Sequence, residues 1–127
     1  MTTAYLDSSG AVAIALGESA GGALSNRLDT FDRIVSSNLL EAELLAALTR
    51  ESVDPRAFSY LEEISWILPR RSLSSEISRV LRAGYTRGAD CWHLATALYF
   101  SADPSELTFV TLDDRQRSVA EKIGFRI

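Results

Sequence analysis

Residues 87–100 read Arg-Gly-Ala-Asp-Cys-Trp-His-Leu-Ala-Thr-Ala-Leu-Tyr-Phe, and this stretch decides the fold. No charged residue follows Asp90 until Asp103, and the apolar side chains leave no polar face wide enough for a surface helix. The pattern predicts a helix that is buried on nearly all sides. Aspartate is rarely buried unless it is paired, caps a helix or binds a metal ion. We therefore interpret Asp90 as one of several acids that converge on a divalent cation.

The composition is that of a globular protein with one core. The chain has 127 residues, of which 46% are hydrophobic and 24% charged, and these values exclude a disordered chain. No repeat or linker interrupts it, so we expect one domain over residues 1–127. The single cysteine, Cys91, cannot form an internal disulfide and is expected to be a small buried hydrophobe.

The sequence predicts a cytoplasmic protein that does not enter a membrane. No basic residue precedes Asp7, so the first residues do not resemble a signal peptide. The uncharged run over residues 91–102 is too short to span a bilayer.

Short β-prone runs alternate with helical patterns along the chain. This alternation predicts an α/β fold in which a central parallel sheet of four to five strands carries helices on both faces. The expected strands cover residues 3–6, 33–36, 66–68, 107–111 and 125–127, and the expected helices 11–16, 23–30, 39–50, 54–65, 74–83, 88–102 and 115–123.

Two of the expected strands are followed by an aspartate. Asp7 ends the first strand and Asp113 follows the strand at residues 107–111. Ligands of open α/β sheets bind beyond the carboxyl ends of the strands, so both carboxylates would face one crevice if these strands are neighbours. Either residue could instead be a simple turn residue.

A fourth acid comes from the apolar helix at residues 39–50, which contains Glu41 and Glu43. Residues two apart on a helix do not share a face, so one glutamate can point to a site while the other points elsewhere. The periodicity does not choose between them. Both could also be surface acids near the start of a helix, where the helix dipole favours them.

The charges are unevenly distributed. Residues 69–87 contain five arginines and one glutamate, whereas the whole chain has a net charge of −4. A basic segment that leads directly to Asp90 suits an anionic ligand, although a solvated helix face with paired arginines would show the same pattern.

Four motifs in this order resemble a PIN domain, in the short form of the VapC-type toxins of bacterial toxin–antitoxin pairs. The motifs are Tyr-Leu-Asp-Ser-Ser at 5–9, Ser-Ser-Asn-Leu-Leu-Glu-Ala-Glu-Leu-Leu-Ala-Ala-Leu at 36–48, Arg-Gly-Ala-Asp-Cys-Trp-His-Leu-Ala-Thr-Ala-Leu at 87–98 and Phe-Val-Thr-Leu-Asp-Asp-Arg at 109–115.

The resemblance implies a site and an activity. Its four acids fall on Asp7, Glu43, Asp90 and Asp113, while Asp114 has no assigned role. It implies a ribonuclease that uses one or two Mg²⁺ or Mn²⁺ ions, hard cations that prefer oxygen ligands. Cleavage would proceed by attack of a metal-activated water on the phosphate.

Polar residues near these acids are expected to orient them. His93 is the only histidine and follows Asp90 by three, on the same helical face. We expect it to be a structural residue, hydrogen-bonded in the core or to a site carboxylate, rather than a general base. Ser8, Ser9 and Thr111 are further candidates for donors to the acids.

The expected partners are an RNA, a protein antitoxin and a second copy of the chain. The resemblance implies a structured RNA such as a transfer or ribosomal RNA, whose backbone the basic segment would hold. It also implies an antitoxin and a homodimer, with contacts expected on residues 11–28 and 54–61. The RNA-binding candidates are Arg70, Arg71, Arg82 and Arg87.

Two other classes of protein remain open at this point. One is a catalytically silent PIN-like domain that serves as an RNA-binding or protein-binding scaffold. The other is a receiver-like regulatory domain, which would require paired acids early in the chain and a lysine late in the sheet. The single lysine, Lys122, lies in the last expected helix.

Overall fold

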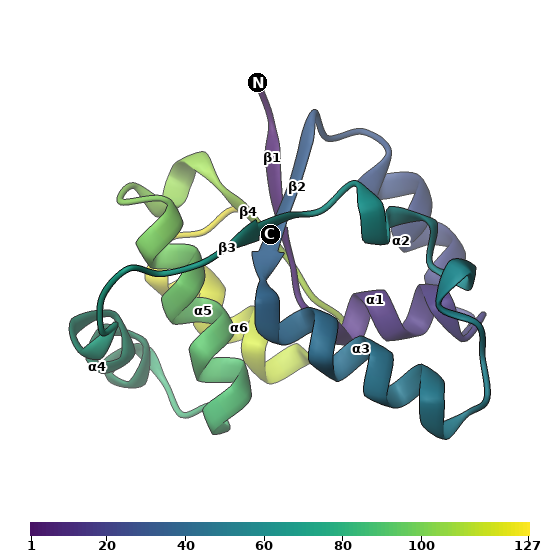
Figure 1. The fold of residues 1–127 in the computed structure, drawn as a ribbon. Helices are drawn as coiled ribbons and strands as arrows, with labels where there is room; N and C mark the ends of the chain where they lie inside the picture. The colour runs from purple at the N-terminus through teal and green to yellow at the C-terminus, as the bar shows by residue number, and fades with distance from the viewer.

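The computed structural model describes residues 1–127 and contains one parallel sheet of four strands in the order β3-β2-β1-β4 (Figure 1). The central strand β1 pairs with β2 and β4, with Tyr5 opposite Val35 on one side and Phe109 on the other. The α/β prediction is therefore confirmed. The strands are β1 (Thr3–Leu6), β2 (Arg33–Ser37), β3 (Ser65–Ile67) and β4 (Thr108–Val110).

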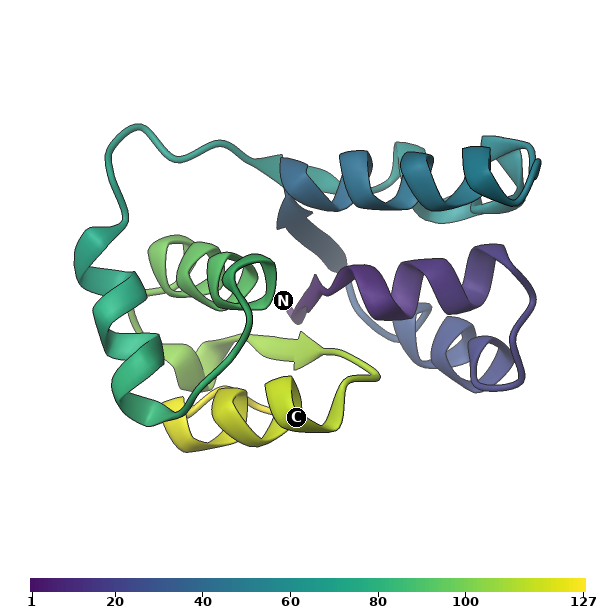
Figure 2. The ribbon, with the colours of Figure 1, turned by 90° about the horizontal axis from the view of Figure 1, so that it is seen from below.

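Helices cover both faces of the sheet because side chains along each strand alternate between two cores. Tyr5 and Phe109 point into the core under α4, α5 and α6, whereas Leu6 and Val110 point into the core under α1, α2 and α3. Figure 2 shows these two groups of helices on opposite sides of the strands. The helices are α1 (Ser8–Ala15), α2 (Gly21–Leu28), α3 (Asn38–Arg50), α4 (Ser74–Ala83), α5 (Gly88–Phe100) and α6 (Asp114–Ile123).

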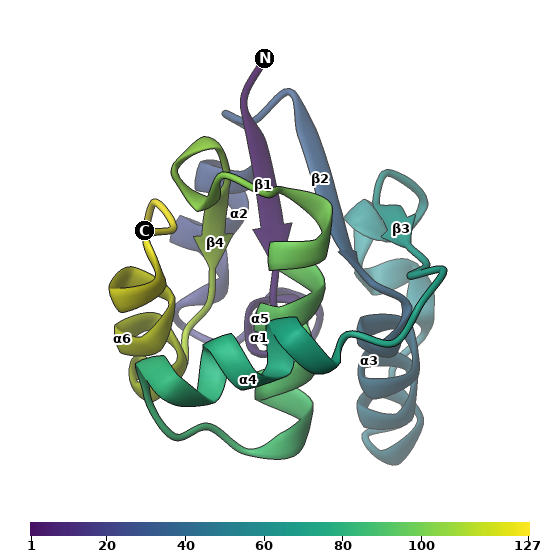
Figure 3. The same ribbon diagram turned by 90° about the vertical axis from the view of Figure 1, so that its left-hand side faces the viewer.

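The helix predicted from the opening stretch is α5, and it is buried as expected. Its only solvent-exposed residues are Gly88 and Ala89 at its start, and every residue from His93 to Leu98 is buried. In Figure 3 this helix crosses in front of β1, between the sheet and α4. The close packing around α5 therefore fixes the position of Asp90 at the carboxyl end of the sheet.

The helix expected over residues 54–65 is wrong. Two short 3₁₀ turns, Pro55–Ala57 and Ser59–Glu62, lie there instead, separated by Phe58 in an extended conformation. Phe58 and Tyr60 are both buried in the same core, which two residues two apart on an α-helix cannot achieve. Burial of both rings therefore outweighs helix propensity here.

The strand expected at residues 125–127 is also wrong. It forms one parallel bridge, between Thr108 and Arg126, rather than a fifth strand. Phe109 N–H donates to Arg126 C=O at 2.8 Å and Arg126 N–H donates to Leu107 C=O at 3.1 Å.

A smaller difference concerns the first helix. The helix expected over residues 11–16 already begins at Ser8, because Asp7 caps α1 by accepting a hydrogen bond from Ser9 N–H. Asp113 caps α6 in the same way through Gln116 N–H. The carboxylates that end β1 and β4 are thus fixed at the starts of the following helices.

Close packing of α2 on α1 gives a testable consequence at Gly21. A Cβ atom at this position would lie 2.7 Å from Ala13 O and 3.0 Å from Ile14 Cα, both of which are backbone atoms. Gly21→Ala is therefore expected to lower the free energy of unfolding by about 2 kcal/mol, measured by urea denaturation. Gly22→Ala is the matched control because its Cβ would meet no atom within 4 Å, and it should be neutral or slightly stabilising. Equal effects at the two glycines would contradict this packing.

None of the helices combines the length and the apolar character that crossing a membrane requires.

Candidate metal centre

Asp7 is the most buried of the four acids, with 1% of its surface exposed. Its Oδ2 atom accepts hydrogen bonds from Ser9 N–H at 3.3 Å, Ser9 Oγ at 2.7 Å and Thr111 Oγ1 at 3.0 Å. Its Oδ1 atom accepts only one, from Gln116 Nε2 at 3.2 Å. Because a carboxylate oxygen has two lone-pair directions, Oδ1 is the atom of Asp7 that is left free for a further ligand.

Gln116, a fully buried residue of α6, connects three of the acids. Its Nε2 donates to Asp7 Oδ1 and to the backbone carbonyl of Asp90 at 3.3 Å, and its backbone N–H donates to Asp113 Oδ1 at 2.8 Å. Its Oε1 lies 2.8 Å from the Thr111 hydroxyl. If the amide were flipped, Oε1 would face Asp7 Oδ1 and the carbonyl oxygen of Asp90, which are both acceptors. These contacts therefore fix the orientation of Gln116.

His93 is fully buried and holds Glu43. His93 Nε2 lies 2.6 Å from Glu43 Oε1, and His93 Nδ1 lies 2.8 Å from the hydroxyl of Tyr5. The Tyr5 oxygen accepts from Ser37 N–H at 3.1 Å, so its own hydrogen has His93 Nδ1 as its acceptor. This pattern assigns the neutral tautomer of His93, in which Nε2–H donates to Glu43.

Burial keeps the Tyr5 hydroxyl protonated, as its hydrogen bond to His93 requires. The pKa of the Tyr5 phenol is raised well above its usual value, mainly because burial disfavours the charged phenolate. The hydroxyl therefore remains protonated and donates to His93. The other glutamate of α3, Glu41, lies elsewhere and accepts a hydrogen bond from Asn38 Nδ2 at 3.1 Å.

Asp90 and Asp113 line one polar hollow of about 200 Å³ at the starts of α5 and α6. Burial raises the pKa of the Asp90 carboxyl, and the negative charges of Asp7 and Asp113 raise it further. The acids are thus close enough to repel one another. A cation placed among them would remove this repulsion.

All four acids lie within one connected network. His93 Nε2 contacts Glu43 and lies 3.9 Å from Asp7 Oδ1, and Gln116 joins Asp7 to the other two acids. No three His, Cys, Asp or Glu side chains are arranged to hold a metal ion together. The donors are nevertheless all carboxylate oxygens, and their mutual repulsion is what a hard divalent cation relieves, so by donor type and charge they fit Mg²⁺ or Mn²⁺.

The other expected residues divide into those near the acids and those away from them. Thr111 and Ser9 donate to Asp7, whereas the Ser8 side chain makes no hydrogen bond within the chain. Arg87 lines the hollow of Asp90. Arg71 and Arg82 line a different hollow over α4, and Arg71 is paired there with Glu76 at 2.5 Å.

Sequence reasoning missed several residues of this region. Gln116 could have been found, because it shares the apolar face of its helix with Val119 and Ala120, where a buried amide needs partners. Tyr5 carries no signal beyond its place in a strand. Arg115 and Thr86 also line the hollow of Asp90, and only the tertiary structure brings them there.

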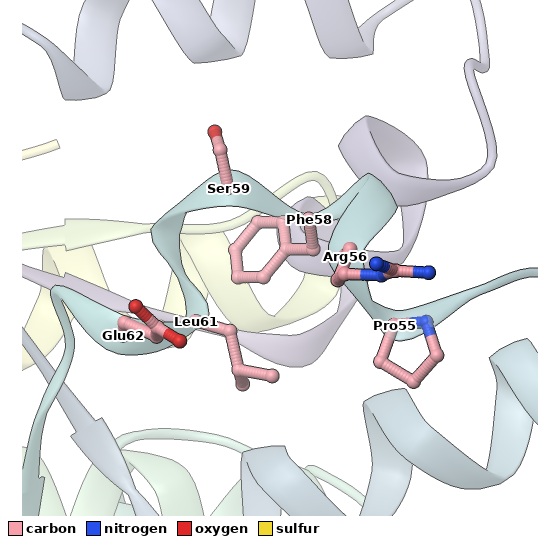
Figure 4. A pocket seen from close by; sticks show the side chains of 6 residues that line it. All are labelled: Pro55, Arg56, Phe58, Ser59, Leu61 and Glu62. Carbon is pink, nitrogen blue, oxygen red and sulfur yellow. The ribbon is translucent and has the colours of Figure 1, made fainter.

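Another hollow, of about 270 Å³, lies over the two 3₁₀ turns and is shown in Figure 4. Its lining residues include no member of the acidic network. It lies within the expected antitoxin-contact segment at residues 54–61. The lining residues are Pro55, Arg56, Phe58, Ser59, Leu61 and Glu62.

Comparison with known proteins agrees with this geometry. The sequence matches the profile of the PIN domain family over residues 4–122. It is 33% identical over 132 aligned residues to Ribonuclease VapC46 of Mycobacterium tuberculosis (strain ATCC 25618 / H37Rv), in an alignment covering 100% of this chain and 97% of that protein. No solved structure matches the chain significantly. With a family match over nearly its whole length and a relative aligned from end to end, the chain belongs to the PIN domain family.

Proposed function

We propose that the chain is a metal-dependent endoribonuclease and the toxin component of a toxin–antitoxin pair. Membership of the PIN domain family and the full-length likeness to a VapC ribonuclease support the activity. The observation that carries the proposal is the gathering of four acidic residues at the carboxyl end of the sheet. His93 contacts Glu43 and lies 3.9 Å from Asp7, and Gln116 contacts the Asp7 carboxylate, Asp113 and the backbone carbonyl of Asp90. In this proposal residues 1–127 act as one domain in the cytoplasm.

The proposed ligands of the cation are Asp7, Glu43, Asp90 and Asp113. Asp7 would bind through Oδ1, since its Oδ2 is saturated by Ser9 and Thr111. When bound, the cation would acidify a water molecule and offset the charge that develops on the phosphate during in-line displacement.

The polar side chains around the acids have a separate task. Gln116 and Thr111 hold Asp7, and His93 holds Glu43, so the carboxylates are oriented before a ligand arrives. Such partners keep the reacting groups in position without touching the substrate. In this scheme His93 donates to Glu43 and does not remove a proton from water.

The test uses purified protein freed of any antitoxin, total cellular RNA, and either Mn²⁺ or EDTA. Discrete fragments are expected with Mn²⁺ and none with EDTA. Asp113→Asn is expected to lose cleavage while remaining folded. Asp114→Asn is the matched control, because the Asp114 side chain is 95% exposed and pairs with Arg117 outside the network, and it should cleave like the wild type.

Failure of this test would favour a different class of protein. A folded protein that binds RNA but yields no fragments with Mn²⁺ would support the catalytically silent scaffold. The absence of three side chains arranged around one ion position is the observation that keeps this second candidate in view.

The proposed partners follow from the family. The substrate is a structured RNA, such as a transfer or ribosomal RNA, cut in an unpaired region where bases are accessible. An antitoxin protein covers part of the surface, with the hollow over the 3₁₀ turns in Figure 4 as a candidate contact. The chain forms a homodimer in this proposal.

A further inference from the structure

The hollow beside Asp90 is lined by basic as well as acidic side chains. It has a volume of about 200 Å³, and none of its lining residues is hydrophobic. Two arginines share it with the two aspartates, so it combines a place for a cation with a place for an anion. The lining residues are Thr86, Arg87, Asp90, Asp113, Arg115 and Gln116.

The two arginines of this hollow are free of carboxylate partners. Arg87 precedes α5 and Arg115 lies in the first turn of α6, and neither forms an ion pair, although two aspartates line the same hollow. The Arg115 guanidinium instead lies over the ring of Tyr85, 5.4 Å from its centroid. Both guanidinium groups therefore keep the planar sets of donors that bind phosphate oxygens in pairs.

Thr86 gives independent evidence for a ligand. Its hydroxyl is buried at the wall of this polar hollow and has no hydrogen-bond partner. The nearby Cys91 thiol does not replace such a partner, because sulfur is a weak hydrogen-bond donor and a weak acceptor. A buried hydroxyl without a partner is unfavourable, so its position indicates an acceptor that occupies the hollow.

The start of α5 adds further donors. The helix begins at Gly88, and its N-cap residue Arg87 makes no side-chain cap, unlike the caps of α1, α3 and α6. The first N–H groups of this 13-residue helix and the positive end of its dipole therefore face the same region without an internal acceptor. This favours an anion there.

We propose that this hollow binds a phosphate group of the RNA strand, adjacent to the phosphate that is cleaved. Arg87 and Arg115 supply the positive charge and the Thr86 hydroxyl supplies a neutral donor. The inference rests on the proposed ribonuclease function and identifies where the strand lies relative to the acids. The cleaved phosphate lies on the acidic side, between Asp90 and Asp113.

The exposed ring of Tyr85 favours RNA over an acidic peptide as the occupant. Tyr85 is 66% exposed, unusually high for a tyrosine, and Arg115 holds it beside the hollow. An aromatic face next to phosphate ligands is typical of proteins that bind single-stranded nucleic acids, because a base can stack there while its phosphate is held.

This placement differs from the path expected from the sequence. Arg71, Arg79 and Arg82 line the other hollow over α4, which shares no residue with the one beside Asp90. Arg71 is also occupied, since it pairs with Glu76 and lies over the ring of Tyr99. The two sets of arginines are therefore separable by mutation.

The first experiment measures binding of a fluorescent single-stranded RNA by anisotropy in EDTA, at several salt concentrations. Arg87→Gln and Arg115→Gln are each expected to weaken binding about tenfold, the effect of losing a charge-assisted hydrogen bond. Each should also lower the slope of log K against log salt by about 0.7. Arg79→Gln is the matched control and should change neither quantity, whereas Arg82→Gln tests the path expected from the sequence.

The second experiment separates a ligand role of Thr86 from a structural one. Thr86→Val and Thr96→Val each remove a buried hydroxyl that has no partner, so both should keep or raise the melting temperature. Only Thr86→Val should weaken RNA binding, by about fivefold, since Thr96 does not line the hollow. Equal RNA affinities of the two valine variants would overturn the role of Thr86.

Three further outcomes separate this proposal from the alternatives and from the proposed ribonuclease function. Weaker binding in the Arg79 and Arg82 variants, with unchanged binding in the Arg87 and Arg115 variants, would overturn it and place the strand over α4. Displacement of RNA by polyglutamate as readily as by polyphosphate would overturn the assignment to phosphate. A wild type that binds through Arg87 and Arg115 but never cleaves with Mn²⁺ would count against the proposed ribonuclease alone.

Discussion

Asp90→Asn is expected to lower RNA cleavage with Mn²⁺ by about 10³-fold, because the variant loses one of the proposed carboxylate ligands, and a cation at such a site would contribute several kcal/mol to catalysis. The amide keeps the shape of the side chain, and the backbone carbonyl of Asp90 that accepts from Gln116 is unchanged. Cleavage is measured as initial rates on a defined RNA. RNA binding in EDTA serves as the control and should be equal or tighter, since one negative charge is removed from the hollow.

The same variant should reveal the repulsion among the acids. The pKa of Asp90 is raised in the folded protein, so its contribution to stability is present below the unfolded-state pKa and is lost as the pH rises through the folded-state pKa. At pH 7 without metal, Asp90→Asn should therefore melt at a higher temperature than the wild type. The difference should shrink as the pH falls and vanish at about pH 2.5, well below the unfolded-state pKa of about 3.9, where the carboxyl is protonated in both states.

Addition of Mn²⁺ should reverse this order at pH 7. A cation at the proposed site would stabilise the wild type by binding the folded state, and it would do so less for the variant that lacks one carboxylate. A wild type that is no less stable than Asp90→Asn without metal, and that gains nothing from Mn²⁺, would show that the acids do not repel one another or share a cation.

His93→Leu is expected to lower the free energy of unfolding by about 2 kcal/mol, since it leaves the buried hydroxyl of Tyr5 without its acceptor. It also releases Glu43, whose carboxylate loses its 2.6 Å contact with His93 Nε2. Loss of such an orienting partner typically costs about 10-fold to 100-fold in activity or metal affinity. Urea denaturation and isothermal titration with Mn²⁺ measure the two effects separately.

Two comparisons distinguish orientation of Glu43 from general-base catalysis. His93→Gln retains an amide donor and should recover part of the Mn²⁺ affinity that His93→Leu loses, with the pH profile of cleavage unchanged in shape. Tyr5→Phe removes the hydroxyl that donates to His93, and its stability should fall between that of the wild type and that of His93→Leu. Disappearance of one limb of the pH profile in His93→Gln, with Mn²⁺ affinity intact, would indicate a general base.

The sequence predicted those parts of the fold that follow from local pattern. The alternation of strands and helices, the buried helix behind Asp90 and the acids at the ends of β1 and β4 all depend on periodicity and on the position of one residue after a strand. The acids that follow β1 and β4 lie close together only because the strand order places these two strands side by side. That order arises from packing between segments far apart in the chain.

The wrong and missing predictions also arise from packing between segments that are far apart in the sequence. Propensity favoured a helix over residues 54–65, but Phe58 and Tyr60 had to enter one core together, and the Tyr60 hydroxyl binds Asp29 at 2.6 Å across the domain. Arg115 and Thr86 carry no local signal because their shared hollow forms only when the starts of α5 and α6 meet. The choice between Glu41 and Glu43 likewise depended on which one faces His93, and periodicity alone does not contain that information.

The central position of β1 has a consequence for when activity can arise during synthesis. Asp7 leaves the ribosome well before the side chains that hold it, since Thr111 and Gln116 lie 104 and 109 positions later. The edge of β1 that β4 will occupy also stays open until Thr108–Val110 have emerged. A nascent or truncated chain that ends before these residues therefore lacks the assembled acids, and the proposed site can form only after Gln116 has emerged.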